Sequence, residues 1–557
     1  MRTICLFVLS GLVAFPATAQ ETLRPDQLLP GMKGYGLSVF RGTRPERFEV
    51  EIVGVLKNAF PKQDMILIKM SGANLERHKV IAGMSGSPIY IEGKLIGALA
   101  YGWTFENEPL AGVTPIHNML AEMDRKSESG TATTVARVGS TSAPQPLLTP
   151  LSLGGFSPRL IQRMSEEFGS YGLLPVAGGM SGALKRSDAD FEPGGAIGVQ
   201  LMRGDLEATA VGTVTYVDKK RHRVLAFGHP FLQAGLFSAP VMHAEIHVVM
   251  SSLQRSFKMA SPISEAGALV GDWQSCIVAD TRATARMIPV RARIINRSSG
   301  HDEHYSLEVI DHPVFTARLL VNALAEIIET ASASSQDTTL QVFLTAELSE
   351  RTVALTNTFF NASGGLFHPG SVLPIAQLFS SPLGRPKIKR AEITLVAAQE
   401  RRTAEIKRAY FEKAQVERGE KARLHIILKP FGQPEVTKTL SIPVPAATDT
   451  VRELAVVITN GANAPSDTAP PDNLNDYLET IQRRHRSTDL VAVIQTAGHG
   501  LPYRGKLLKN LPPSALAVLG DELPLGAIGA ADVQQLVLPT DWVLSGTATA
   551  RVPIRQE

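Results

Sequence analysis

The sequence predicts a mainly-β protein with two β units, followed by a β-sandwich-like module and a small α+β C-terminal domain. Three observations support this prediction. The chain has 557 residues, which is long enough for several domains. Apolar or alternating runs rich in β-branched residues recur along it, and turns that contain Gly or Pro separate them. Helical periodicity is limited to a few segments.

The composition is that of an ordinary globular protein, with 44% hydrophobic and 20% charged residues. The formal net charge of +3 is too small to indicate a nucleic-acid partner. We expect no nucleic acid among the partners of this chain, and no motif in it points to a cofactor.

The N-terminus is typical of a secretory signal. Met1-Arg2 gives a positive start, Ile4 to Phe15 an apolar core, and residues 17–19 (Ala-Thr-Ala) a small-residue cleavage site. The apolar core is too short for a transmembrane helix, and no later segment is apolar enough to span a membrane. We expect removal of residues 1–19 and a periplasmic or secreted mature chain without a transmembrane segment.

Cysteine usage points to a structural role for the one thiol of the mature chain. Cys5 lies in the signal, so only Cys276 remains and no intrachain disulfide can form. A nucleophilic Cys276 is the alternative, but no turn that carries a His lies close by in sequence. We expect Cys276 to be a buried, small apolar residue.

The first β unit is expected to contain strands near residues 48–56, 65–70 and 95–101, where the sequence alternates or becomes fully apolar. After a linker rich in Ser, Thr, Pro and Gly, an amphipathic helix begins beyond Ser157 and ends before Gly169. The expected segments are the signal 1–19, the first β unit 20–123, the linker and helix 124–185, the second β unit with a helix 186–386, the sandwich-like module 387–446 and the C-terminal domain 447–557.

The second β unit is expected to end one of its strands at residue 227 and to contain a helix from Pro313 to about Thr330. Residues 387–446 alternate like the strands of a sandwich. The C-terminal domain has a polar helix near 476–486 and further strands.

The most informative stretch is residues 83–88, Gly-Met-Ser-Gly-Ser-Pro, which lies between an apolar run and a β-branched run. Acyl transfer needs a nucleophilic Ser on a sharp turn, with backbone N–H groups aimed beside its Oγ. Gly83 and Gly86 permit such a backbone and would let a substrate carbonyl approach closely to Ser85. The alternative interpretation is a glycine-rich hairpin of a β protein.

His229 is the second candidate, because it follows Gly228 at the end of an apolar strand, where small neighbours would present it as a general base. A hydrogen-bonded loop His is the alternative. A carboxylate that orients this His could come from Asp64, which opens an apolar strand, or from Asp272 or Asp218. For each, the alternative is a turn or strand-edge carboxylate.

Two further motifs carry weaker signals. Residues 179–182 repeat Gly-Met-Ser-Gly, but charged residues follow Ser181, so we expect a loop. His243 and His247 have the spacing of helical zinc ligands, yet the surrounding Val-rich sequence favours a strand. We expect no metal site there.

Residues 83–89, with the Gly-Lys turn that follows them, resemble the serine-bearing segment of the SpoIVB (stage IV sporulation protein B) peptidase family. Residues 211–216 and 226–229 look like its histidine-bearing segment, although the two segments occur here in the reverse order. The resemblance implies chymotrypsin-like β-barrels, Ser85 as nucleophile and His229 as base. Residues 64–69 are similar to the segment that carries the triad aspartate in trypsin-like peptidases, which would make Asp64 the third residue.

We therefore expect a serine endopeptidase that acts on proteins or peptides, with the N–H groups of Gly83 and Ser85 as the oxyanion hole. The alternative is a non-catalytic envelope scaffold or binding protein that retains the fold. In either case the C-terminal modules could bind an envelope protein partner.

Overall fold

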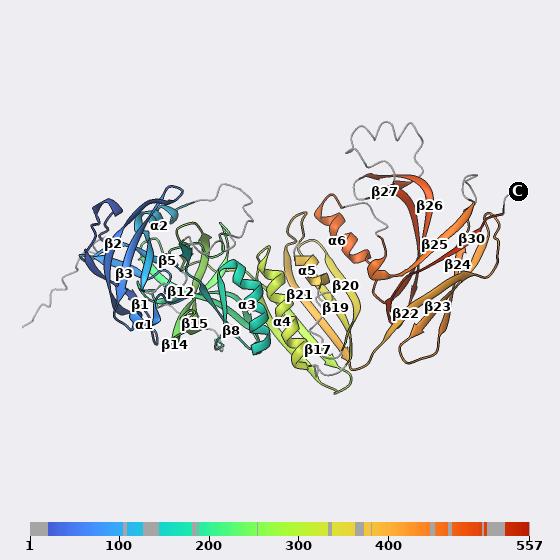
Figure 1. Ribbon diagram of the computed structural model, residues 1–557, viewed down its shortest axis with the longest axis horizontal. Coiled ribbons are helices and arrows are strands. Elements are labelled where there is room, and N and C mark those ends of the chain that lie inside the picture. Colours follow the sequence, from blue (N-terminus) through green and yellow to red (C-terminus); the bar gives the residue numbers. More distant parts are fainter. Residues whose placement is uncertain are drawn as a thin grey trace, which may run out of the picture. The chain divides into compact units, whose positions relative to one another are not determined.

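The computed structural model describes residues 20–103, 108–125, 144–180, 185–186, 189–252, 254–331, 337–362, 373–379, 381–445, 452–465, 471–503, 506–509 and 530–555. The expected signal and most of the expected linker lie outside these residues. Strand residues make up 53% and helical residues 14% of the structure (Figure 1), which confirms the mainly-β prediction. The chain divides into a first unit (Met1–Ser152, Phe168–Val199 and Ala210–Thr284) and a second unit (Leu153–Glu167, Gln200–Thr209 and Ala285–Glu557).

The first unit opens with a closed barrel of six strands, drawn in blue in Figure 1. The pairing order β4-β1-β2-β3-β6-β5 closes because β4 also pairs with β5. Along β2, Phe48, Val50 and Ile52 are buried while Glu49 and Glu51 are exposed, as the alternation predicts. The elements of this region are η1 (Pro25–Gln27), β1 (Lys33–Ser38), β2 (Glu46–Phe60), β3 (Gln63–Ser71), α1 (Leu75–His78), β4 (Pro88–Ile91), β5 (Lys94–Gly102), β6 (Leu110–Pro115), α2 (Ile116–Glu122) and β7 (Gln145–Pro146).

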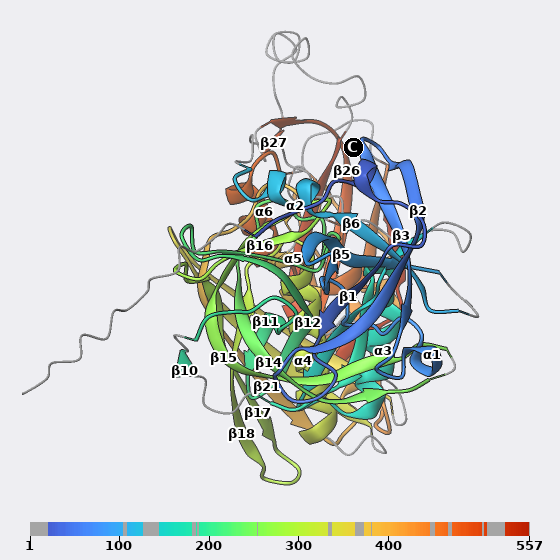
Figure 2. The same ribbon diagram turned by 90° about the vertical axis from the view of Figure 1, so that its left-hand side faces the viewer.

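A second closed ring of strand pairings lies in the next part of the chain. Its order is β11-β14-β15-β16-β13-β12, and the pairing of β11 with β12 closes it. Figure 2 shows the long antiparallel strands β14 and β15 side by side. The elements are β8 (Thr149–Gly154), η2 (Gly169–Tyr171), β9 (Leu173–Ala177), β10 (Lys185–Arg186), β11 (Ala196–Gly204), β12 (Glu207–Asp218), β13 (Arg223–Ala226), β14 (Ala239–Met250), β15 (Phe257–Asp272) and β16 (Ile277–Asp280).

Both rings contribute to one buried apolar cluster. Its members come from β4, β5 and α2 on one side and from β13, β16 and the turn before β16 on the other; they are Tyr90, Leu95, Ala98, Ile116, Met119, Met123, Leu225, Trp273, Cys276 and Val278. Cys276 is fully buried, which confirms its prediction as a buried residue. Burial raises the pKa of its thiol well above the usual value.

The second unit contains a sheet in the order β20-β19-β21-β17-β18, in which β17 and β21 are parallel. Helix α3 follows Ser157 and stops at Gly169, as predicted, and the predicted helix after Pro313 forms α4. The elements are α3 (Pro158–Phe168), β17 (Met287–Asn296), β18 (Asp302–Ile310), α4 (Phe315–Ala331), β19 (Thr338–Leu348), β20 (Thr352–Asn361), α5 (Leu373–Phe379) and β21 (Ile388–Ala398). No helix among the described residues has the length and apolarity needed to cross a membrane.

The last two sheets of the second unit share one core. Its buried side chains include Ala422, Leu424 and Ile426 of β23 together with Leu454 and Val456 of β25. The predicted boundary at residue 446 therefore separates strands that pack together. The sheets are built from β22 (Thr403–Phe411), β23 (Lys421–Pro430), β24 (Val436–Pro443) and β29 (Val543–Ser545), and from β25 (Glu453–Asn460), β26 (Asp489–Tyr503), β27 (Lys506–Lys509), β28 (Ala530–Pro539) and β30 (Ala548–Pro553); η4 (Gly461–Asn463) and α6 (Leu474–Arg483) lie between strands.

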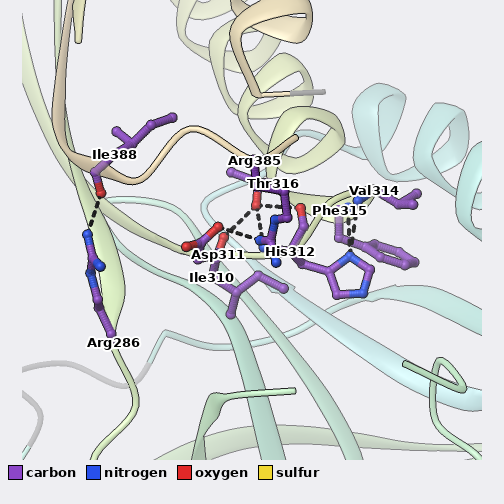
Figure 3. A network of polar contacts seen from close by, with 9 residues as sticks. All are labelled: Arg286, Ile310, Asp311, His312, Val314, Phe315, Thr316, Arg385 and Ile388. Carbon is purple, nitrogen blue, oxygen red and sulfur yellow. Dashed lines mark hydrogen bonds and ion pairs between the residues drawn. The ribbon is translucent and has the colours of Figure 1, made fainter. Parts of the chain in front are cut away.

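A neutral His caps α4 (Figure 3). His312 Nδ1 accepts hydrogen bonds from the N–H groups of Val314 (3.1 Å) and Phe315 (3.2 Å), so this nitrogen carries no proton. Thr316 Oγ1 in turn accepts a hydrogen bond from the His312 backbone N–H at 2.7 Å. Burial, and then the Arg385 guanidinium, lower the pKa of His312 to about 3.

Removal of this cap is expected to destabilise the second unit. His312→Ala should lower its free energy of unfolding by about 1–2 kcal/mol, the usual effect of losing an N-cap, whereas His312→Asn keeps an acceptor. Because the folded pKa of about 3 lies below the ordinary 6.5, the unfolded chain binds the proton first, and stability is lost as pH falls through this window. Calorimetry between pH 7 and pH 3 should therefore show that the free energy of unfolding falls more steeply in the wild type than in His312→Asn. Parallel curves for the two proteins would contradict the assignment.

Candidate active site

Ser85 lies on a double turn between α1 and β4. The N–H of Met84 donates to Ile81 O (3.0 Å), and the N–H of Ser87 donates to Met84 O (2.9 Å). The third residues of these two turns are Gly83 and Gly86, whose φ angles are +96° and +97°. Both angles lie in the left-handed region that favours Gly, as the sequence predicts for a sharp turn.

The space beside these glycines is filled by protein. A Cβ on Gly86 would lie 1.9 Å from Thr213 O and 2.5 Å from Phe227 N, and a Cβ on Gly83 would lie 3.2 Å from Lys258 Cδ. At Gly86, therefore, Gly is needed because the backbone of the second strand ring approaches the Ser85 turn too closely for a side chain.

Strand β12 holds the Ser85 turn through three hydrogen bonds. The N–H of Thr213 donates to Ser85 O (2.9 Å), and its Oγ1 donates to Gly83 O (2.9 Å). Thr215 Oγ1 donates to Gly86 O at 2.7 Å. The turn that carries Ser85 is thus fixed from the second ring, although the first ring supplies its chain.

The His229 turn reaches the same place from β13. Phe227 and Gly228 both have left-handed φ angles, +71° and +69°. The N–H of Phe227 donates to Thr213 O (3.3 Å), and Gly228 O accepts from Thr114 Oγ1 of β6 (2.5 Å). Thr213 therefore bonds to the Ser85 turn through its N–H and to the His229 turn through its carbonyl.

The two candidate side chains are buried with one reactive atom each unpaired. Ser85 is fully buried and His229 is 2% exposed, and neither Ser85 Oγ nor His229 Nε2 has a hydrogen-bond partner among the described residues. His229 Nδ1 lies 2.7 Å from Pro230 O. A carbonyl only accepts, so Nδ1 carries the proton and Nε2 presents a lone pair. Burial lowers the pKa of His229 to about 4, which keeps the ring neutral.

The predicted oxyanion donors are unused within the part of the chain that the structure describes. The N–H groups of Gly83 and Ser85 donate to no group there, whereas those of Met84, Gly86 and Ser87 are all hydrogen-bonded. Free N–H groups, here that of Ser85 itself and that of Gly83, are a precondition for an oxyanion hole.

Asp64 lies near the β2–β3 hairpin, and no hydrogen bond or ion pair among the described residues joins it to His229. Its carboxylate accepts from the Asn58 N–H (2.9 Å) and pairs with Lys57 Nζ (3.2 Å). The Asn58 hydrogen bond, followed by Lys57, lowers its pKa. Asp64 thus has the role of a hairpin carboxylate. It bonds to neither ring nitrogen of His229, because Nδ1 lies at Pro230 O and Nε2 has no partner among the described residues. Asp218 likewise serves a turn, where it accepts from the N–H groups of Lys220 and Arg221.

Asp272 supports the loop that follows His229. Its oxygens accept from the N–H groups of Phe231 (2.8 Å), Leu232 (2.7 Å) and Ala234 (3.0 Å). Burial raises its pKa to about 6, against these hydrogen bonds, so the carboxylate is ionised at neutral pH. Asp272 therefore fixes the backbone of the His229 loop and forms no hydrogen bond with the imidazole.

Lys258 of β15 is a residue of the site that the sequence prediction missed. It is fully buried, and its Nζ donates to Ser38 Oγ (2.8 Å) and Thr213 Oγ1 (3.4 Å). The sequence gives no direct signal for it, because a lone Lys in a strand normally faces solvent, and the burial of Ala260 on the same strand face is known only from the structure.

The remaining motifs lie elsewhere in the fold. Ser181 falls outside the described residues. His243 and His247 lie on β14, a strand as predicted, and bond separately to Ala189 O (3.1 Å) and Ser261 Oγ (2.8 Å). Within the described segments, no group of three or more His, Cys, Asp or Glu could hold a metal ion.

A cavity of about 540 Å³ begins beside the Ser85 turn. Its lining includes Ala82, three residues before Ser85, and Phe257, next to Lys258. The rest of the lining is mixed: its apolar members include Val80, Trp103, Leu147 and Leu174, its polar members are Gln145, Ser252, Gln254 and Ser256, and its basic members are His78, Lys79 and Arg255, with no acidic residue. A cavity of this size beside the Ser85 turn is large enough to hold a ligand side chain.

Residues 32–120 match the family model described as SpoIVB peptidase S55. The match covers the six-stranded barrel and the Ser85 turn, and it ends before the strand ring that carries His229. No curated protein and no solved structure matches the chain. The family match confirms the resemblance seen around Ser85 and supports a peptidase.

Proposed function

We propose that this chain is a periplasmic or secreted serine endopeptidase in which Ser85 is the nucleophile and His229 the general base. One observation carries the proposal. Two turns from different strand rings are bonded to the same residue, Thr213, and each brings a buried side chain whose reactive atom is unpaired. The family match over residues 32–120 supports the reaction class.

The chemistry follows the arrangement of donors and acceptors. Ser85 Oγ attacks the peptide carbonyl while His229 Nε2 takes its proton, and the N–H groups of Gly83 and Ser85 bind the oxyanion. His229 then gives this proton to the leaving amine, which departs from the acyl-enzyme. Water attacks the acyl carbon by the reverse path, with His229 again as base, and frees Ser85. The Oγ–Nε2 hydrogen bond is not formed in this structure, so it must form when substrate binds.

Pro230 O takes the place that a carboxylate holds in a triad. It fixes the tautomer of His229, but as a neutral group it stabilises the imidazolium less than an ion would. Asp272 contributes indirectly, because it holds the loop after His229 in place. The cavity beside Ala82 is the proposed site for an apolar substrate side chain.

Burial of Ser85 favours the second candidate function, a non-catalytic envelope scaffold or binding protein. With Ser85 fully buried, no substrate reaches Oγ without a change of conformation. In that function, the last two sheets, which share one core, would bind an envelope protein partner.

We expect a fluorophosphonate probe to label the purified mature chain at Ser85. Ser85→Ala should abolish labelling because the new bond forms at Oγ, and His229→Ala should slow it by about 10²–10⁴-fold, the usual contribution of a general base. Ser181→Ala, in the repeated Gly-Met-Ser-Gly motif, is the matched control and should label like the wild type. Labelling that survives Ser85→Ala, or no labelling of a folded wild type at any pH, would favour the scaffold.

The acid limit of labelling should lie unusually low. The pKa of His229 is lowered to about 4 by burial, and only the neutral ring accepts a proton. Residual labelling should therefore persist to about pH 4 and vanish below it, whereas an ordinary His would stop near 6.5. Rates measured from pH 9 to pH 3 test this, with intrinsic fluorescence to show that the chain stays folded. Complete loss already near pH 6.5 would contradict the assignment.

Asp272→Asn should loosen the His229 loop. The new amide NH₂ faces backbone N–H groups that need an acceptor, so the free energy of unfolding should fall by about 1–3 kcal/mol and labelling should slow. Asp218→Asn removes a turn carboxylate away from the site and serves as the control. Thermal melts and labelling rates are compared; equal labelling by Asp272→Asn and Asp218→Asn would exclude a role for Asp272 in placing His229.

A further inference from the structure

Lys258 is a buried amine without a carboxylate partner among the described residues. Its Nζ has two neighbours, the hydroxyls of Ser38 and Thr213, and its aliphatic stem lies against Gly83. A buried lysine of this kind is costly to the fold, so its position next to a candidate nucleophile suggests a function.

Lys258 reaches the three peptide carbonyls that precede Ser85. Its own backbone N–H donates to Ala82 O at 3.0 Å. Its Nζ reaches Gly83 O through Thr213 Oγ1, with steps of 3.4 and 2.9 Å. It reaches Met84 O through Ser38 and Ser87, with steps of 2.8, 3.0 and 2.7 Å.

The donor and acceptor in each hydrogen bond of the two side-chain paths follow from the number of hydrogens that each group carries. A carbonyl only accepts and each hydroxyl has one hydrogen, so Ser87 donates to Met84 O and Thr213 donates to Gly83 O. Ser38 must then donate to Ser87 and accept from Lys258. Lys258 therefore has to supply two hydrogens, one to each path.

We propose that Lys258 is the positioning residue of the oxyanion-binding turn, an inference that rests on the proposed peptidase function. In a trans peptide the N–H points opposite the carbonyl of the same plane. Holding Ala82 O and Met84 O thus aims the N–H groups of Gly83 and Ser85, the two proposed oxyanion donors. Holding Gly83 O fixes the plane between them.

The neutral amine is the form that fits this network. It has the two hydrogens that the paths need, whereas the ammonium adds a third hydrogen without an acceptor among the described residues. The groups facing Nζ are hydroxyls, its stem lies against Gly83, and its register partner on β14 is Val249. No titratable side chain contributes to the shift; burial alone lowers the pKa of Lys258 to about 7. The turn should therefore tighten as pH rises through about 7.

Three substitutions separate the two paths. Lys258→Met keeps the volume of the stem and removes both, Ser38→Ala cuts the path to Met84 O, and Thr213→Val cuts the path to Gly83 O but keeps the backbone N–H bonded to Ser85 O. Lys94→Met, a half-exposed lysine paired with Glu21, is the matched control.

Two readouts decide the outcome. Fluorophosphonate labelling should slow at least tenfold in Lys258→Met and less in each single-path variant. In the wild type the labelling rate should rise by a partial step as pH passes through about 7, and this step should be absent in Lys258→Met. Ser38→Ala added to Lys258→Met should cause no further loss, because the path is already broken. Amide hydrogen exchange of a peptide covering residues 80–91 should accelerate in Lys258→Met and not in Lys94→Met.

Hydrogen exchange keeps the two proposals distinguishable. If the wild type is not labelled but exchange at 80–91 accelerates in Lys258→Met, the peptidase function fails and Lys258 still positions the turn. If exchange at 80–91 and labelling in Lys258→Met match the wild type and Lys94→Met, the inference about Lys258 is overturned. A single-path variant with the full effect would overturn the two-path assignment.

Discussion

The backbone of Gly86 lies against the backbone of Thr213 with no room for a side chain, and the candidate site depends on this contact. It joins the turn of one strand ring to a strand of the other, and the same Thr213 carbonyl receives the N–H of Phe227 from the His229 turn. Any side chain at position 86 would push the Ser85 turn away from Thr213 and Phe227. The site is therefore a property of the interface between two β rings, and the chain order of the two residues does not matter to it.

Polar groups within the site are arranged by what they can donate and accept, with little net charge. A carbonyl sets the tautomer of His229, a carboxylate fixes the backbone of its loop, and an amine supplies hydrogens to the Ser85 turn. The lowered pKa values of His229 and Lys258 cost the fold stability as pH falls, from 6.5 to about 4 for His229 and from 10.5 to about 7 for Lys258. The raised pKa of Asp272 acts in the opposite direction between about 6 and 3.8.

Local sequence patterns predicted the elements, and long-range contacts were beyond them. Alternation in β2 and the cap signals around α3 follow from one buried face and from backbone satisfaction, so the sequence shows them directly. The turns of Ser85 and His229 were predictable because Gly83, Gly86 and Gly228 permit left-handed φ angles, although Phe227 adopts one as well. The choice between Asp64 and Asp272 depended on which loops meet in space. Lys258 sits on the buried face of its strand, but a lone Lys in a strand is normally expected to face solvent.

Full burial of Ser85 has a consequence for how such a site would respond to other molecules. Only conformations that uncover Oγ can react, so the observed rate is the intrinsic rate multiplied by the fraction of molecules that are open. A ligand that binds the open form more tightly than the closed one raises this fraction by their affinity ratio, until nearly all molecules are open. The closed structure thus leaves room for activation by binding alone, with no new catalytic group.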